Sequence, residues 1–80
     1  MKLKIGQRWL YKDSMYSWIV EVSRVGPMPT GRIIQKIKDD WLKEWGTTIY
    51  SIGYEYSMHD CDGQHSYCWT YLKGQDKPCD

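Results

Sequence analysis

Residues 17–25 read Ser-Trp-Ile-Val-Glu-Val-Ser-Arg-Val, and they form the clearest strand pattern in the chain. Trp18, Val20 and Val22 fall on alternate positions, so a period of two places them on one face of an extended strand. The β-branched side chains of this segment pack well on a pleated surface, which supports the assignment. We therefore expect a strand that turns Trp18, Val20 and Val22 toward a core.

Similar patterns lie on both sides of this segment. Residues 5–12 predict a first strand, with four side chains on one side: Ile5, Gln7, Trp9 and Tyr11. Residues 26–31, Gly-Pro-Met-Pro-Thr-Gly, predict a break because proline lacks the N–H that a ladder needs. A third strand is expected from about Arg32 to Lys38, with Ile33 and Ile37 on one face.

The second half of the chain has weaker signals. Residues 39–46 fit a short helix capped by Asp39 or Asp40 and stopped by Gly46, and they fit equally a turn followed by a strand. Residues 47–52 predict a fourth strand that ends at Gly53, and residues 54–56 extend it past a bulge. Residues 67–72 predict the last strand.

Five short strands favour an all-β fold, a small five-stranded antiparallel SH3-like barrel, because closure removes exposed sheet edges. A small oligonucleotide-binding-type barrel is the second choice. We expect residues 1–80 to form a single domain, with residues 73–80 as a polar C-terminal tail.

Tryptophan and tyrosine dominate the aromatic content. The 80 residues include five Trp and seven Tyr but no Phe. A chain of this length buries only about 60% of its unfolded surface, so bulky rings are needed to build its core. Because Trp and Tyr also carry a polar atom, they suit half-exposed positions on a binding surface.

Charge is distributed unevenly along the chain. Residues 1–38 hold eight Lys and Arg against two acids, whereas residues 39–80 hold three Lys against eight acids, and the net charge is +1. This total argues against a strongly basic nucleic-acid-binding protein. The two halves either form opposite faces, which would favour a homo-oligomer, or interleave in space.

The three cysteines, Cys61, Cys68 and Cys79, are an odd number, which argues against a closed disulfide framework. The chain has no signal-peptide stretch at its start and no apolar run long enough to span a membrane. We therefore expect a cytoplasmic protein with reduced thiols and without a membrane partner.

No complete catalytic motif occurs, and we expect neither an enzyme nor a cofactor. The weak candidate for a metal site is a group of two imidazoles and two thiols, with a non-standard spacing for zinc, made by His59, Cys61, His65 and Cys68.

Several aromatic side chains are candidates for ligand binding. Trp41, Trp45, Tyr54 and Tyr56 lie where strand alternation is least clear, so we expect them to stack on a ligand or to form an interface. Arg24 and Arg32 flank the Pro/Gly segment and are the expected partners of a phosphate or an acid. A single-stranded nucleic-acid site would draw on another set: Tyr11, Tyr16, Trp18, Arg24, Arg32 and Lys36.

The two ends of the chain carry a resemblance. Residues 4–9, Lys-Ile-Gly-Gln-Arg-Trp, are followed by Trp-Ile-Val-Glu-Val at residues 18–22, and residues 69–78 read Trp-Thr-Tyr-Leu-Lys-Gly-Gln-Asp-Lys-Pro. Together they resemble a loose group of short, uncharacterised proteins of tailed phages and prophages. The resemblance covers about 30 residues and carries over no functional residue.

A phage origin would imply a protein that counters host defence inside the infected bacterium. The leading expectation is a sponge that sequesters a nucleotide immune signal. The alternatives are a protein-binding inhibitor of a host defence factor and a single-stranded nucleic-acid-binding accessory protein. Small size, no catalytic motif and an excess of Trp and Tyr agree with all three.

Overall fold

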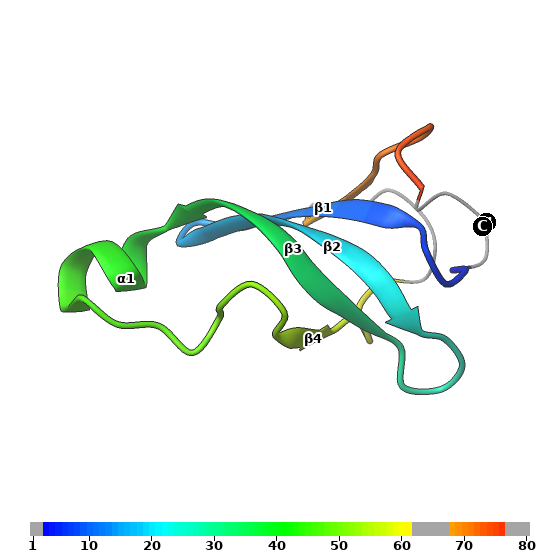
Figure 1. Ribbon diagram of the computed structural model, residues 1–80, viewed down its shortest axis with the longest axis horizontal. Helices are drawn as coiled ribbons and strands as arrows, with labels where there is room; N and C mark the ends of the chain where they lie inside the picture. Colours follow the sequence, from blue (N-terminus) through cyan, green and yellow to red (C-terminus); the bar gives the residue numbers. More distant parts are fainter. Residues whose placement is uncertain (1–2, 62–67, 77–80) are drawn as a thin grey trace.

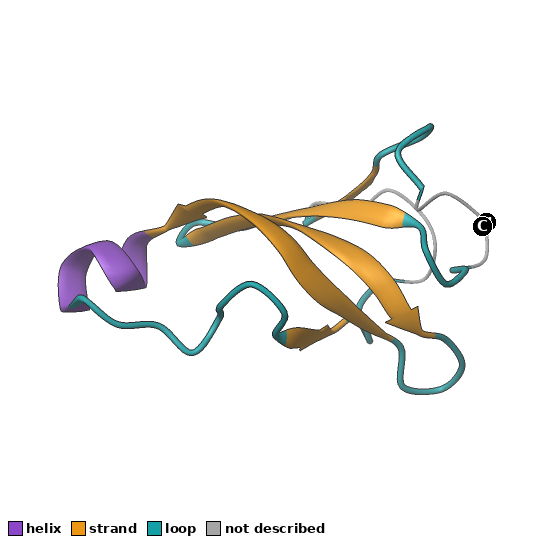
Figure 2. Ribbon diagram, in the orientation of Figure 1, coloured by secondary structure: helices purple, strands orange, loops and turns teal. Residues whose placement is uncertain are grey.

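The computed structural model describes residues 3–61 and 68–76, and it contains five strands and one helix within them (Figure 1). In chain order these are β1 (Arg8–Lys12), β2 (Tyr16–Arg24), β3 (Thr30–Asp39), α1 (Asp40–Trp45), β4 (Glu55–Ser57) and β5 (Trp69–Tyr71). The strands form one antiparallel sheet in the order β4-β3-β2-β1-β5. Figure 2 shows that α1 projects beyond one end of this sheet.

The prediction of an all-β, five-stranded antiparallel fold is confirmed, but the expected closure of the barrel is not. β4 and β5 are the two edges of an open sheet, and within residues 3–61 and 68–76 no backbone pairing joins them. Side chains approach across the opening instead, because the rings of Tyr56 and Trp69 lie 6.3 Å apart. The arrangement is roughly consistent with an SH3-like fold whose edges are not hydrogen-bonded together.

The predicted faces of β1 and β2 are confirmed. Trp18, Val20 and Val22 are buried, and so are Trp9 and Tyr11 of β1. Tyr11 lies opposite Trp18 in the ladder and Trp9 lies opposite Val20, which brings the large side chains of the two strands together. Only Ile5 departs from the predicted set, since it lies before β1 and is exposed.

The prediction for β3 is wrong at Ile37, which is 57% exposed while Ile33 is fully buried. The ladder between β2 and β3 skips Ile34 and again Ile37, because Trp18 pairs with Lys36 and Val20 pairs with Ile33. Each β-bulge adds one residue to β3 and reverses the alternation beyond it. The bulges therefore place Lys36, and not Ile37, beside Trp18.

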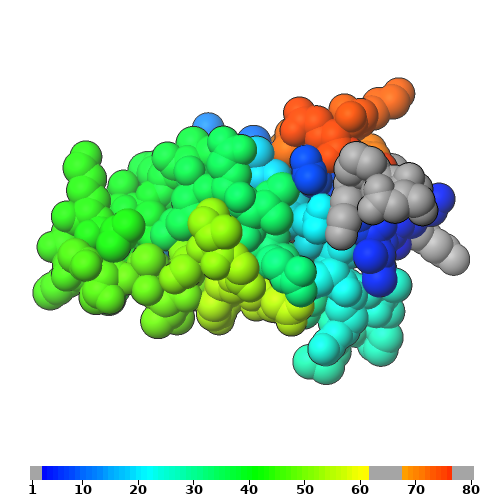
Figure 3. All heavy atoms as spheres, in the orientation of Figure 1, coloured from blue at the N-terminus to red at the C-terminus, as the bar shows by residue number. Residues whose placement is uncertain are grey.

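The predicted fourth strand over residues 47–52 is wrong, because this segment is irregular and β4 begins only at Glu55. A turn at Gly53, whose φ is +93°, separates the segment from β4. Pairing with β3 starts beyond this turn, where the N–H of Ile33 donates to the Tyr54 carbonyl at 2.9 Å. Figure 3 shows the residues after α1 lying along β3 in this view.

The predicted break at residues 26–31 is shorter in the structure, since Thr30 and Gly31 already belong to β3. The last strand is also shorter than predicted, with β5 limited to residues 69–71, and residue 67 lies outside the described residues.

The core lies between the inner face of the sheet and the segment that leads into and out of β4. Three tryptophans, Trp9, Trp18 and Trp69, have no exposed surface. Two of their indole N–H groups donate to side chains, Trp9 to Gln7 at 3.3 Å and Trp69 to Asp60 at 3.0 Å. These three large rings, two of which keep their polar atoms bonded, supply the apolar surface that so short a chain needs.

Gly31 of β3 permits this packing at its closest point. A Cβ at this position would lie 2.8 Å from the Met58 sulfur and 2.8 Å from two carbon atoms of Val20. Such distances are shorter than any normal contact, and Val20 is fixed in the centre of the sheet.

We expect Gly31→Ala to lower the free energy of unfolding by about 1–3 kcal/mol, because an added methyl in a close-packed core forces its neighbours apart. Urea denaturation measures the loss, and Gln35→Ala, at an exposed position of the same strand, is the control. A stability equal to that of the control variant would contradict the packing described for Gly31.

Candidate binding surface

Helix α1 stands at one end of the sheet and is held by its two caps. The Asp39 carboxylate accepts a hydrogen bond from the Leu42 N–H at 3.0 Å, and Gly46 ends the helix with φ 73° and ψ 6°. This confirms the helical alternative for residues 39–46. None of the six residues of α1 is buried, although a helix this short is marginal without tertiary packing.

Asp39 also joins α1 to the sheet and to the following segment. Its carboxylate forms an ion pair with Lys36 of β3 and lies near the Thr48 hydroxyl. Burial by itself would raise the pKa of Asp39, but Lys36, the Leu42 N–H and the Thr48 hydroxyl lower it below the ordinary 3.8. One carboxylate thus connects α1 to β3 and lies beside the segment that follows the helix.

A hollow of about 250 Å³ opens beside α1. Three aromatic rings line it together with two smaller side chains, and the five residues are Tyr16, Trp41, Thr48, Ile49 and Tyr50. Tyr50 forms its inner wall, because its ring lies 5.2 Å from the ring of Tyr16 and 5.2 Å from that of Trp18. The hollow is therefore backed by the aromatic core.

Exposed apolar side chains are concentrated in the part of the chain that contains α1 and the segment after it, and two of them, Trp41 and Ile49, line the hollow. Seven of the ten large apolar side chains that are exposed among the described residues lie between residues 37 and 54. We call this surface the aromatic end, and it consists of Ile37, Trp41, Leu42, Trp45, Ile49, Ile52 and Tyr54. Soluble monomers rarely expose such a concentration, which commonly marks an interaction site.

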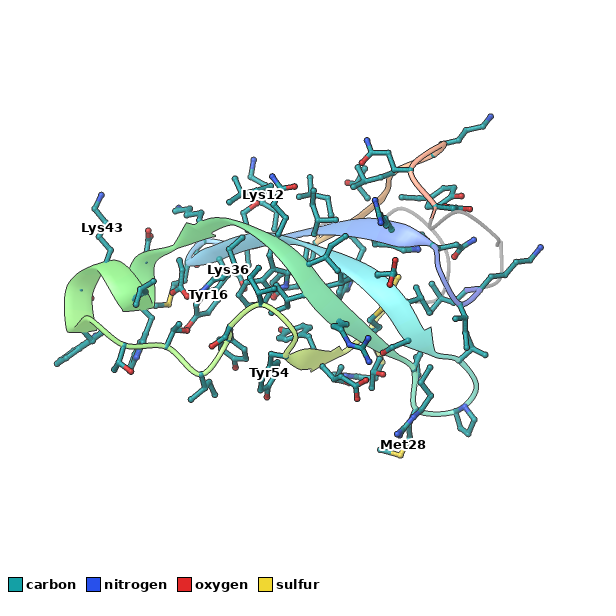
Figure 4. The ribbon with its side chains drawn as sticks, in the orientation of Figure 1. Lys12, Tyr16, Met28, Lys36, Lys43 and Tyr54 are labelled. Atoms are coloured by element: carbon teal, nitrogen blue, oxygen red, sulfur yellow. The ribbon has the colours of Figure 1, made fainter. Side chains whose placement is uncertain are left out.

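The four predicted aromatic ligand-binding residues do not form one group in the structure. Trp41 and Trp45 lie side by side on α1, with ring centroids 5.6 Å apart, as their spacing predicts. Tyr54 contacts Tyr50 at 5.1 Å and stays partly exposed (Figure 4). Tyr56 points into the core, where its ring packs against Trp18 at 5.2 Å, so it supports the surface from behind.

The two predicted arginines lie away from the aromatic end. Figure 1 shows the loop between β2 and β3, which Arg24 and Arg32 flank, at the opposite end of the sheet from α1. Arg32 is engaged with Glu55 of β4 at 3.5 Å. The structure therefore does not bring these guanidinium groups to the tryptophans that were expected to share a ligand with them.

Three lining residues, Thr48, Ile49 and Tyr50, were not identified as site residues from the sequence. They fall in the segment that was interpreted as a strand, where an alternating pattern would have divided them between two faces. The excess of tyrosine was the only signal, and it does not distinguish Tyr50 from the other six tyrosines.

Charges of the two halves of the chain interleave in space. The ion pairs Lys36–Asp39, Lys38–Asp40 and Arg32–Glu55 each join the basic half to the acidic half. Across the sheet, Arg8, Glu21, Arg32 and Glu55 follow one another on neighbouring strands with alternating sign. No separate basic face follows from this arrangement of the described residues.

The candidate metal ligands that the structure describes differ in their burial. Cys61 is buried in the core, Cys68 is half-buried, and His59 is exposed with its Nδ1 3.0 Å from the Ser57 hydroxyl. His65 lies outside the described residues. Within residues 3–61 and 68–76, no group of three His, Cys, Asp or Glu side chains is arranged to hold a metal ion.

The hydroxyl of the buried Tyr11 is held protonated. Burial, together with the hydrogen bond to Asp13 and the neighbouring Tyr56 hydroxyl, raises the pKa of Tyr11 far above its usual range. Its hydroxyl donates to the Asp13 carboxylate at 2.6 Å, and the same carboxylate accepts the N–H groups of Met15 and Tyr16 at 2.8 and 2.7 Å. These bonds fix the turn between β1 and β2.

No protein-family model matches the chain, and no curated protein and no solved structure is significantly similar to it. None of the helices among the described residues has the length and apolar character that a membrane crossing requires. The aromatic end is therefore interpreted from its own geometry.

We expect the stability of the native protein to fall as the pH drops below about 4, partly because of Asp39. Its pKa is lowered on folding, so its contribution is present above the ordinary value of 3.8 and is lost as the pH falls through the folded value. Asp39→Asn should cost about 1–3 kcal/mol at pH 7, because Lys36 loses its partner, and should flatten this acid dependence.

Urea denaturation between pH 7 and pH 2 measures both effects. Asp40→Asn is the control, because it removes the neighbouring carboxylate from a solvent-exposed ion pair, in which Asp40 and Lys38 lie 3.5 Å apart. Equal acid dependence in native protein and Asp39→Asn would show that Asp39 is not the group that links these elements.

Proposed function

We propose that this protein is a non-enzymatic protein-binding module that docks its partner on the aromatic end. The observation that carries the proposal is a hollow of about 250 Å³ lined by the exposed side chains of Trp41 and Ile49, within a segment that holds seven exposed apolar side chains. Trp and Tyr are enriched at the few positions that dominate binding energy in protein interfaces, where they fill pockets or line them.

The size and lining of the hollow favour a side chain of a protein partner over a whole small molecule. Pockets for drug-sized ligands measure about 300–1,000 Å³, so a volume of about 250 Å³ suits one ring or one branched aliphatic group. None of the five described residues that line the hollow carries a positive charge, and Lys36 of β3 is paired with Asp39. A phosphate would find no partner there.

Phage counter-defence supplies the biological setting of this proposal. The resemblance of the chain ends to phage and prophage proteins would make the partner a host defence factor, and the module its inhibitor. A cytoplasmic site of action in the infected bacterium fits such a role.

Sequestration of a nucleotide immune signal is the second candidate. It is favoured by one observation, the three aromatic rings of Tyr16, Trp41 and Tyr50 around one hollow, on which a base can stack. The phosphates would have to be bound from outside the hollow, because Arg24 and Arg32 lie at the other end of the sheet.

Replacement of Trp41 by alanine tests whether the aromatic end binds anything, and the kind of molecule that is lost distinguishes the two candidates. We expect Trp41→Ala to weaken capture of a host protein by at least about 30-fold, because a ring that walls the hollow is lost. Immobilised native protein and variant are compared for retained proteins and for small molecules released by heat, both identified by mass spectrometry.

Met28→Ala is the matched control, since Met28 is an exposed apolar side chain in the loop at the opposite end (Figure 4). A protein retained by native chain and Met28→Ala but lost by Trp41→Ala supports the module. A nucleotide with that behaviour supports the second candidate, and equal retention by all three proteins contradicts a binding role of the aromatic end.

A further inference from the structure

We propose that the aromatic end binds a second copy of this chain, with Trp45 of each copy inserted into the hollow of the other. This inference rests on the proposed binding role of the aromatic end and names the first occupant of that surface. It is argued from three features: a protruding ring, a hollow of matching size beside it, and a rim of mixed charge.

Trp45 has the properties of a protruding anchor. It is 65% exposed, against 43% for Trp41, and it belongs to a helix that has no buried residue. Its one ring contact among the described residues is Trp41, at 5.6 Å. An indole held in this way on a capped helix costs little entropy when it binds, because its backbone is already ordered.

The hollow lies directly beside this anchor. Trp41 is the shared element, because it packs against Trp45 and at the same time lines the hollow with Tyr16 and Tyr50. A volume of about 250 Å³ accepts one indole ring, and the aromatic walls allow tilted ring contacts of the kind found throughout the core.

An anchor and its receptor on one surface make that surface self-complementary. A two-fold axis places the same patch of both copies face to face, so residue i of one copy meets residue j of the other, and the reverse contact follows automatically. Trp45 and the hollow meet this condition, since each copy offers both. One apposition therefore forms two equivalent insertions and covers the exposed apolar side chains around them.

The polar rim of the aromatic end favours a second copy over a partner of one charge sign. Lys38, Asp40, Lys43 and Glu44 lie on α1 or directly before it and supply two positive and two negative groups. A surface of mixed sign can pair with itself, whereas a surface of one sign repels its own copy. Lys43 stands on the exposed side of α1, away from the sheet (Figure 4).

Two single substitutions test the two halves of the contact. Trp45→Ala removes the anchor and leaves the hollow, whereas Ile49→Glu leaves the anchor and places a carboxylate at the hollow, where its burial would be unfavourable. Both sites are more than half exposed, so the fold should tolerate either change, which circular dichroism and thermal unfolding verify. Met28→Ala is again the control.

Light scattering over a concentration series measures the mass. We expect native protein and Met28→Ala to reach twice the chain mass of 9.6 kDa, and each of the two variants alone to dimerise at least about 30-fold more weakly. An equimolar mixture of Trp45→Ala and Ile49→Glu should recover part of the dimer, because one anchor then meets one intact hollow.

Three outcomes would overturn the inference: a native chain that stays monomeric, variants that dimerise as the native chain does, or a mixture that recovers nothing. The first of these leaves the proposed function intact if Trp41→Ala still loses a different protein partner. Equal retention of host proteins by native protein, Met28→Ala and Trp41→Ala would contradict the proposed function. If the native chain then still forms a dimer that Trp45→Ala and Ile49→Glu weaken, the dimer is supported on its own.

Discussion

Contact between Trp18 and the tyrosines around it holds the two layers of this protein together. The indole ring lies near the start of β2 and is fully buried, and it packs against four tyrosine rings, those of Tyr11, Tyr16, Tyr50 and Tyr56. Tyr50 and Tyr56 come from the segment that crosses the inner face of the sheet. Without these contacts the irregular residues between α1 and β4 would have little reason to lie against the sheet at all.

The indole N–H of Trp18 is buried at an energetic cost. The Nε1 of Trp18 is buried with no hydrogen-bond partner among the described residues, unlike the corresponding atom of Trp9 or Trp69. An unsatisfied buried donor costs about 1–3 kcal/mol, so packing of the indole against its four neighbours has to outweigh this amount. The apolar area of a buried indole, about 150–250 Å² at about 25 cal/mol per Å², is large enough to do so.

A second, polar centre organises the end of the molecule where binding is proposed. Asp39 caps α1 and pairs with Lys36, so one carboxylate positions the helix and the strand before it. The bulges of β3 make this possible, because they turn Lys36 toward the inner side and Ile37 toward solvent. The exposed rings of α1 thus project from a rigid base, which is what a binding surface requires.

Local patterns in the sequence determined the fold class and the strands β1 and β2 with their buried faces, and they offered the capped helix over residues 39–46 as one of two alternatives. These features depend on neighbours within a few residues: alternation along a strand, a carboxylate three positions before an N–H, and a glycine that adopts a positive φ. The predicted roles of Trp41 and Trp45 remain predictions, but their position on one face of α1 followed from their spacing alone.

Only the tertiary structure decided the rest. The bulges in β3, the open edges of the sheet and the irregular course of residues 47–52 depend on how the tyrosines pack against Trp18, which joins residues far apart in the sequence. The hollow likewise joins Tyr16 of β2 to Trp41 of α1 and to Tyr50 beyond it. A binding surface built across such distances leaves no local pattern, because its residues become neighbours only after the chain has folded.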